Sequence, residues 1–358
     1  MVEQEQMLIK AAEHVKSAIS QRHYYQKKKE EAMATMENNP AERSLCYVAD
    51  YSQNMAVPSF SFEQPGETYY YSPLAAYCFG VVDCATDHLS AYTYTEDIAK
   101  KGGNNVASLL WHHLWLQKVL STDEPFKEIT FIFDNCSGQN KNRMVLRLLF
   151  FLVKLGITKV ARASFLIRGH TKNDCDRLFN VMKKGYRNSN IYLPADLVES
   201  MKHKQVTPVW CDANVFFDWD SGEDKYLTRP TKVKSYHVFT FDIDKDDGDT
   251  LTKMYSHNIN QKIRQNMVKK EFRGKDKAFW KGVTQTLDRI DPVGIQDIKW
   301  RELYDKWGPL IPAEKKLGLM YYHEDPGVER RNKIKANTKK AKDARKGRTT
   351  SAATTTKE

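Results

Sequence analysis

The sequence predicts an α/β protein in which a mixed β-sheet is flanked by helices. Three strand-like runs joined by short links come first, and strand-like runs then alternate with apolar helical patterns. Short links predict an antiparallel meander, and the later alternation predicts parallel strands added to the same sheet. The 41% hydrophobic and 11% aromatic content is sufficient for a real core.

The first part of the chain predicts a helix followed by the meander. Residues 3–37 form one long polar helical pattern that ends at the breaker Asn38-Asn39-Pro40. The charged second half of this pattern, QKKKEE, is most simply a solvated face. The three strand-like runs follow at residues 45–51, 73–83 and 89–94.

The next part predicts the strand–helix alternation. Gly102-Gly103 breaks the chain before a helical pattern over 106–120, and a buried strand over 129–133 ends at Asp134. The remaining elements are a helix over 142–155 closed by Gly156 as a C-cap, a strand over 160–167, and a helix over about 173–184 that stops at Gly185. The resulting order, β-β-β-α-β-α-β-α, is that of a ribonuclease H-like fold with a five-stranded sheet.

The texture of the sequence predicts four regions. Aromatic strand-like pieces with acidic turns fill residues 196–260, and short helical segments broken by prolines follow them. The pattern does not distinguish an insertion domain from an extension of the core. The predicted regions are an N-terminal helix (1–40), a ribonuclease H-like core (41–195), a C-terminal extension, β-rich and then helical (196–325), and a basic disordered tail (326–358).

Most of the net charge of +11 lies in the tail. Between Glu329 and Arg348 there are ten Lys or Arg residues and two acidic residues, so the rest of the chain is close to neutral. A basic tail without apolar periodicity predicts disorder and salt-sensitive binding to nucleic acid phosphates. The residues that carry this prediction are Arg330, Arg331, Lys333, Lys335, Lys339, Lys340, Lys342, Arg345, Lys346 and Arg348.

The composition predicts an intracellular protein, nuclear or cytoplasmic. The six cysteines form no CxxC pair and no dense framework, which is typical of reduced thiols. The N-terminus is charged and lacks the apolar core of a signal peptide. The longest apolar stretch, 144–156, is short and interrupted by Arg147 and Lys154, so no membrane span is expected.

Three aspartates predict a metal site. The first and fourth strands of the predicted order are neighbours, so Asp50 and Asp134 would face one crevice, with Asp176 near the start of the last helix beside them. Converging carboxylates repel one another unless a cation is bound, and hard oxygen ligands favour Mg²⁺ or Mn²⁺. Two such ions can activate a water and stabilise the leaving oxygen of a phosphodiester.

Each aspartate also has a simpler interpretation. An Asp after a strand is often an Asx turn or a helix cap, and Asp174 or Asp176 could complement a helix dipole. Asp174 is a close rival of Asp176 for the third carboxylate.

Other motifs are weaker. The loop SGQNKN lacks the G-x-x-x-x-G-K-[ST] pattern of a P-loop. His170 with Cys175 and Cys136 would make only a partial zinc site, and Cys136 as a nucleophile lacks an evident base. The pair His112-His113 lacks HExxH spacing and predicts packing or surface.

Three strings carry a family resemblance: YVADYSQN, FDNCSGQNKN and GHTKNDCDRLF, in this order. They resemble an uncharacterised domain family of transposon-derived eukaryotic proteins, which itself looks like a ribonuclease H-like DDE/D transposase core. EHVKSAISQRHYYQ resembles the helix that precedes this core, and DPVGIQDIKWRELYDKWGPLIP resembles its C-terminal segment. The resemblance covers roughly residues 13–323.

The resemblance implies roles for individual residues. It assigns the acidic trio to Asp50, Asp134 and Asp176, and it makes His170 a substrate-contact or supporting residue. In a catalytic mechanism, His170 would orient the attacking water or the scissile phosphate. The resemblance also implies metal-dependent cleavage or strand transfer on DNA. The alternative is a domesticated or inactive protein that binds nucleic acid or acts as a scaffold. The sequence does not indicate protein partners. The implied substrate-contact or supporting residues are Gln53, Asn135, Gln139 and Asn140.

Overall fold

A computed structural model describes residues 2–62, 66–221, 223–255 and 261–327 and confirms the predicted α/β class. All five predicted strands are present and form the centre of one sheet in the order β4-β3-β1-β5-β6. β1 runs parallel to β5, and β5 parallel to β6, whereas β3 is antiparallel to both β1 and β4. This is the predicted meander followed by parallel additions. The strands are β1 (Ser44–Tyr51), β3 (Leu74–Asp83), β4 (His88–Thr95), β5 (Phe126–Phe133) and β6 (Thr158–Phe165).

The sheet is larger than the five strands predicted, since the described residues contain ten. One strand from the 196–260 region adds in parallel to β4 at one edge of the five strands. Two further strands of this region and one strand over residues 262–266 continue from β6 in antiparallel fashion at the opposite edge. They satisfy the backbone groups that both edges of a five-stranded sheet would leave unpaired. The additional strands are β2 (Met55–Val57), β7 (Val206–Trp210), β8 (Val238–Asp242), β9 (Thr250–Met254) and β10 (Lys262–Asn266).

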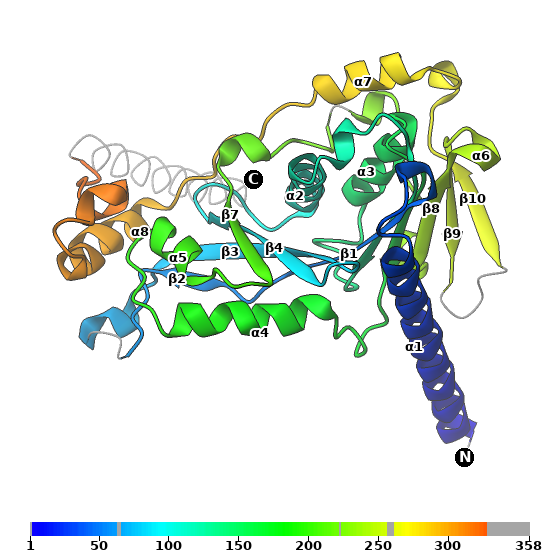
Figure 1. The fold of residues 1–358 in the computed structure, drawn as a ribbon. Coiled ribbons are helices and arrows are strands. Elements are labelled where there is room, and N and C mark those ends of the chain that lie inside the picture. Colours follow the sequence, from blue (N-terminus) through cyan, green and yellow to red (C-terminus); the bar gives the residue numbers. More distant parts are fainter. Residues whose placement is uncertain (1, 63–65, 222, 256–260, 328–358) are drawn as a thin grey trace, which may run out of the picture.

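The alternation of side chains along β1 shows how the two faces are covered. Tyr47 and Ala49 belong to the core beneath α2 (Gly103–Leu116) and α3 (Arg143–Lys154). Cys46 and Val48 lie on the opposite face, in the core shared with α4 (Asp174–Arg187) and with Tyr25 of α1 (Val2–Ala34). Figure 1 shows α2 and α3 on one side of the sheet and α4 on the other.

The predicted N-terminal helix is confirmed as α1, but its charged second half is not simply solvated. Lys28 forms an ion pair of 2.7 Å with Glu128 of β5, and Lys29 forms one of 2.7 Å with Asp174 of α4. These cations pair with acidic groups on the face that α1 covers, whereas the first half of α1 extends away from the body (Figure 1).

Two glycines have the roles that backbone geometry requires. Gly156 has a φ of +65° and follows α3, which confirms the predicted C-cap. Gly185, predicted to end α4, instead lies inside it. A Cβ at Gly185 would be 1.9 Å from the backbone oxygen of Ser200, so this glycine permits close packing rather than ending the helix.

The remaining helices complete the two outer layers. α7 covers α3 (Figure 1), and α8 begins a separate apolar cluster in which Trp300, Leu303 and Trp307 pack together. In the described residues no helix is both long and apolar enough to cross a membrane. These helices are α5 (Pro194–Ser200), α6 (Ile243–Asp246), α7 (Lys277–Gln285) and α8 (Asp297–Glu302).

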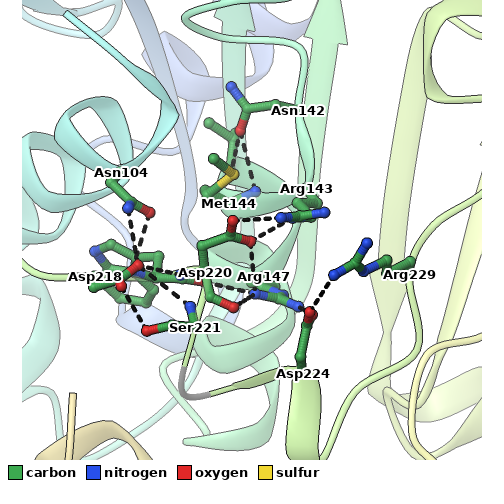
Figure 2. Close-up of polar contacts among 12 residues, drawn as sticks. Asn104, Asn142, Arg143, Met144, Arg147, Asp218, Asp220, Ser221, Asp224 and Arg229 are labelled. Carbon is green, nitrogen blue, oxygen red and sulfur yellow. Dashed lines mark hydrogen bonds and ion pairs between the residues drawn. The ribbon is translucent and has the colours of Figure 1, made fainter. Parts of the chain in front are cut away.

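A buried arginine ties the 218–229 segment to α3. Arg147 has no exposed side-chain surface; it forms ion pairs with Asp220 and Asp224 and donates to the backbone oxygen of Trp219 at 2.8 Å. Arg143 also pairs with Asp220. Figure 2 shows these side chains pointing toward one another, so the charges of this group are mutually compensated.

Candidate functional site

Strand register brings Asp50 and Asp134 together. Ala49 pairs with Phe133 in the parallel β1–β5 ladder, so the two aspartates directly follow paired positions on strands about 4.8 Å apart. Val48 and Ile132 lie in the core on the α4 face. Side chains two positions apart along a strand lie on the same face of the sheet. Asp50 therefore shares the α4 face with Val48, and Asp134 shares it with Ile132.

The N-terminus of α4 meets the same point. Asn173, the N-cap of α4, donates from its side-chain amide to Asp50 Oδ2 at 3.2 Å. Gly80 stands opposite Asp50 on β3, and a Cβ there would be 2.6 Å from the ring of Phe179. A glycine at this position therefore lets α4 approach the sheet closely enough to reach Asp50.

The environment of Asp50 opposes its negative charge. Burial raises the pKa of its carboxyl to about 7, with further upward contributions from the charges of Asp134 and Asp176. Hydrogen bonds from Asn173 and from the Tyr51 backbone N–H act in the opposite direction. In the described part of the chain, no Lys or Arg forms an ion pair with any of the three predicted aspartates.

The loop after β5 holds Asp134 through local hydrogen bonds. Its Oδ1 accepts from the side-chain amide of Asn140 at 2.5 Å and from the Cys136 backbone N–H at 3.2 Å. Asn140 is fully buried, so it fixes the carboxylate from inside the protein. The contact with Cys136 is the Asx turn that the simpler interpretation of Asp134 describes.

The structure separates the two rival carboxylates of α4. Asp174 accepts from Tyr25 at 2.8 Å and pairs with Lys29 at 2.7 Å, so it fastens α4 to α1. Burial opposes its charge, but these partners hold the pKa of Asp174 below its ordinary value. Asp176 is exposed; its Oδ2 accepts from the Asn173 backbone N–H at 3.1 Å in a capping box, and its charge acts on Asp50.

The other predicted residues are distributed around this point. Asn135 accepts from Lys141 at 3.1 Å, and the Gln139 backbone oxygen accepts from Asn142 at 2.8 Å, so both contribute to the loop after β5. Gln53 is exposed just beyond β1. The ring of His170 lies 5.4 Å from that of His14 on α1, and its orienting role stays a prediction. All ten tail residues lie outside the described residues.

Three residues near the carboxylates were not predicted as site residues from the sequence. Asn173 is the first residue of the helix predicted over about 173–184 and the N-cap of α4, and a cap residue is a recognisable signal. Lys101 approaches Asp50 closely enough for their charges to interact, while burial lowers its pKa. Lys141 lies within the string SGQNKN, but nothing in that string shows that its ammonium is buried.

The weaker motifs turn out to be packing. Cys175 is buried and directs its thiol at the Val48 backbone oxygen, 3.3 Å away. His113 is buried with Nδ1 2.8 Å from the Tyr92 hydroxyl, and burial lowers its pKa to about 3. Both belong to the core, as the absence of HExxH spacing suggested for His113.

The residues present fit a divalent ion in part. Two adjacent carboxylates without a paired cation are an oxygen-rich donor set of the kind that Mg²⁺ uses. Within the described ranges, however, no three His, Cys, Asp or Glu side chains form a ready-made metal cluster. Asp50 and Asp134 are therefore brought together, while Asp176 stands beside them through Asn173.

The model of a protein family described as a domain of unknown function (DUF7869) matches residues 68–260. This match covers more than half of the chain, so the chain belongs to this family. The matched residues include Asp134 and Asp176, whereas Asp50 and α1 lie before them. Comparison with curated proteins and with solved structures found no match.

Proposed function

We propose that this protein cleaves or transfers DNA phosphodiester bonds with the help of Mg²⁺ or Mn²⁺. The observation that supports the proposal best is the pair of carboxylates, Asp50 and Asp134, at the ends of adjacent central strands. They repel each other and have no paired cation among the described residues. An ion bound between them would relieve that repulsion.

The chain's own residues would prepare the site for this chemistry. Asp50 and Asp134 would hold the ion, and Asp176 would complete its surroundings from α4. Asn140 and Asn173 are positioning residues, because each donates an amide hydrogen bond to one of the two central carboxylates. When bound, the ion would activate water and stabilise the leaving oxygen.

The test is DNA cleavage by the full chain in Mg²⁺ or Mn²⁺, with EDTA as the metal-free reference. Asp134→Asn should reduce cleavage to background because it removes a charged ligand but keeps the shape of the side chain. Asp174→Asn is the matched control, since its carboxylate already pairs with Lys29, and it should keep activity. Equal cleavage by wild type and Asp134→Asn would reject the assignment.

A second candidate is a nucleic-acid-binding or scaffold protein that does not use these carboxylates for catalysis. It is favoured by the lack of a ready-made three-residue cluster in the described residues, and by the turn and cap contacts of Asp134 and Asp176. Salt-sensitive DNA binding that is independent of metal and unchanged in Asp134→Asn would favour this candidate.

We also propose a transposon-derived origin and a nuclear location, on the motifs and the basic tail. Removing residues 329–358 takes away eleven cationic side chains and should weaken DNA binding and nuclear accumulation without unfolding the body. Unchanged affinity and location after this deletion would reject the role of the tail.

A further inference from the structure

A cavity of about 490 Å³ lies beyond the carboxyl ends of β5 and β6, at the same end of the sheet as Asp134. Asn135 and Ser137 reach it from the loop after β5, and Arg168 from the segment after β6. α1 contributes His14, and the segment before β8 contributes Lys234 and His237. Its volume suits a ligand of nucleotide size.

The floor of the cavity contains a buried cation. Lys141 is 2% exposed, and its ammonium donates to Asn135 Oδ1 and to the Lys234 backbone oxygen, both at 3.1 Å. It also lies 5.5 Å from the centroid of the Phe165 ring. An ammonium has three N–H donors, so one remains without an acceptor among the described residues.

No carboxylate in the cavity lining compensates the positive charge of Lys141. Arg168 and Lys234 are exposed basic residues of the lining, and no Asp or Glu is among the lining residues. Burial and the nearby positive charge of Arg168 lower the pKa of Lys141 to about 8. Buried cations are ordinarily paired, so this arrangement lacks an anion.

We propose that this cavity binds a phosphate group of a nucleic acid strand next to the bond that Asp50 and Asp134 would process. The proposal rests on the proposed function for the identity of the strand. Lys141 is the buried charge at the base of the site, Arg168 and Lys234 are cations at its rim, and the Ser137 hydroxyl is a further donor. Phosphate is preferred because several cationic and hydroxyl donors converge without an acidic neighbour in the lining.

The test measures binding of a fluorescein-labelled single-stranded oligonucleotide to the full chain in EDTA, with inorganic phosphate as competitor. Lys141→Gln and Arg168→Gln should each weaken oligonucleotide binding about tenfold, the effect of losing one charge-assisted hydrogen bond. The slope of log affinity against log salt should become shallower by about 0.7 for each lost phosphate contact. Lys281→Gln on α7, outside the cavity, is the charge-matched control.

The outcomes separate this site from the catalytic proposal. Lys141-dependent binding in a protein that cleaves no DNA would support the phosphate site and reject catalysis. Binding by both cavity variants that equals that of Lys281→Gln would overturn the site, even if cleavage depended on Asp134. Lys141-dependent binding of inorganic phosphate with unchanged oligonucleotide binding would overturn the strand assignment. Arg168 is exposed, so its variant keeps the test valid if Lys141→Gln does not fold.

Discussion

Two groups of aspartates, one on each face of the sheet, differ in how their negative charge is compensated. On the α3 side, Asp220 and Asp224 are paired with Arg143, Arg147 and Arg229 (Figure 2). On the α4 side, Asp50 and Asp134 lie together without a cation paired to either among the described residues. Both groups are partly buried, yet only the first is compensated within the chain.

This difference distinguishes a structural group from a candidate site. Partners within the chain pull the pKa of Asp224 below its ordinary value, with Arg229 making the largest contribution. Burial and neighbouring carboxylates push the pKa of Asp50 up to about 7. A carboxylate without a paired cation can be neutralised by a proton or by a bound cation, so Asp50 marks a candidate binding site.

Breaking the ion pairs that Arg147 forms with Asp220 and Asp224 should destabilise the protein more than any other change. Arg147→Met keeps most of the side-chain volume but leaves two carboxylates and two backbone oxygens without their buried donor, so it should cost about 3–5 kcal/mol. Urea denaturation at pH 7 measures the change. Arg177→Met is the control; it breaks a pair with Asp87 whose side chains are 49% and 40% exposed, and it should cost less than about 1 kcal/mol. Equal losses in both variants would contradict the comparison.

Replacing Asp50, which has no paired cation among the described residues, should have the opposite effect and stabilise the folded protein. In EDTA, the raised pKa of Asp50 means that the folded protein binds a proton more tightly than the unfolded chain, so stability falls as pH rises from about 4 to about 7. Asp50→Asn should remove this fall and stabilise the protein at pH 8 by roughly 2 kcal/mol, a value reduced for partial exposure.

The control for Asp50 is the paired carboxylate of Asp174. Its pKa is held below the ordinary value, so its contribution to stability is present at neutral pH and is lost as pH falls through the folded pKa. Asp174→Asn should therefore destabilise the protein at pH 7. Urea titrations at pH 4, 6 and 8 separate the two cases, and a destabilised Asp50→Asn protein at pH 8 would contradict the interpretation.

The smallest expected effect is a change with pH in the phosphate affinity of the cavity that contains Lys141. Above pH 8 the free Lys141 loses its proton, so inorganic phosphate affinity should fall about tenfold between pH 7 and pH 9. The titratable and charged groups that face it are Arg168, Lys234, His14 and His237. Isothermal titration with Lys141→Arg should show a flatter pH profile; an equally steep profile would rule out Lys141 as the titrating group.

Local pattern predicted much of the fold. The apolar runs and breakers placed all five central strands and the three helices that pack on them, because period and punctuation are properties of short segments. Asp50 and Asp134 were predicted to meet for the same reason, since each ends a strand. Of the four additional strands β7 to β10, only β8 falls in a predicted aromatic strand-like piece, and the other three were not predicted, because their pairing partners are distant in sequence.

The acidic pair, its strand ends and the basic tail can be read directly from the residues, because each depends on neighbours within a few positions. Tertiary structure alone directs Asp174 toward Lys29, leaves Asp176 within reach of Asp50, and buries Lys141 beneath an acid-free lining. A side chain's partner and burial depend on residues brought from more than a hundred positions away, as with Lys29 and Asp174. Whether a charge is compensated is therefore decided by the fold.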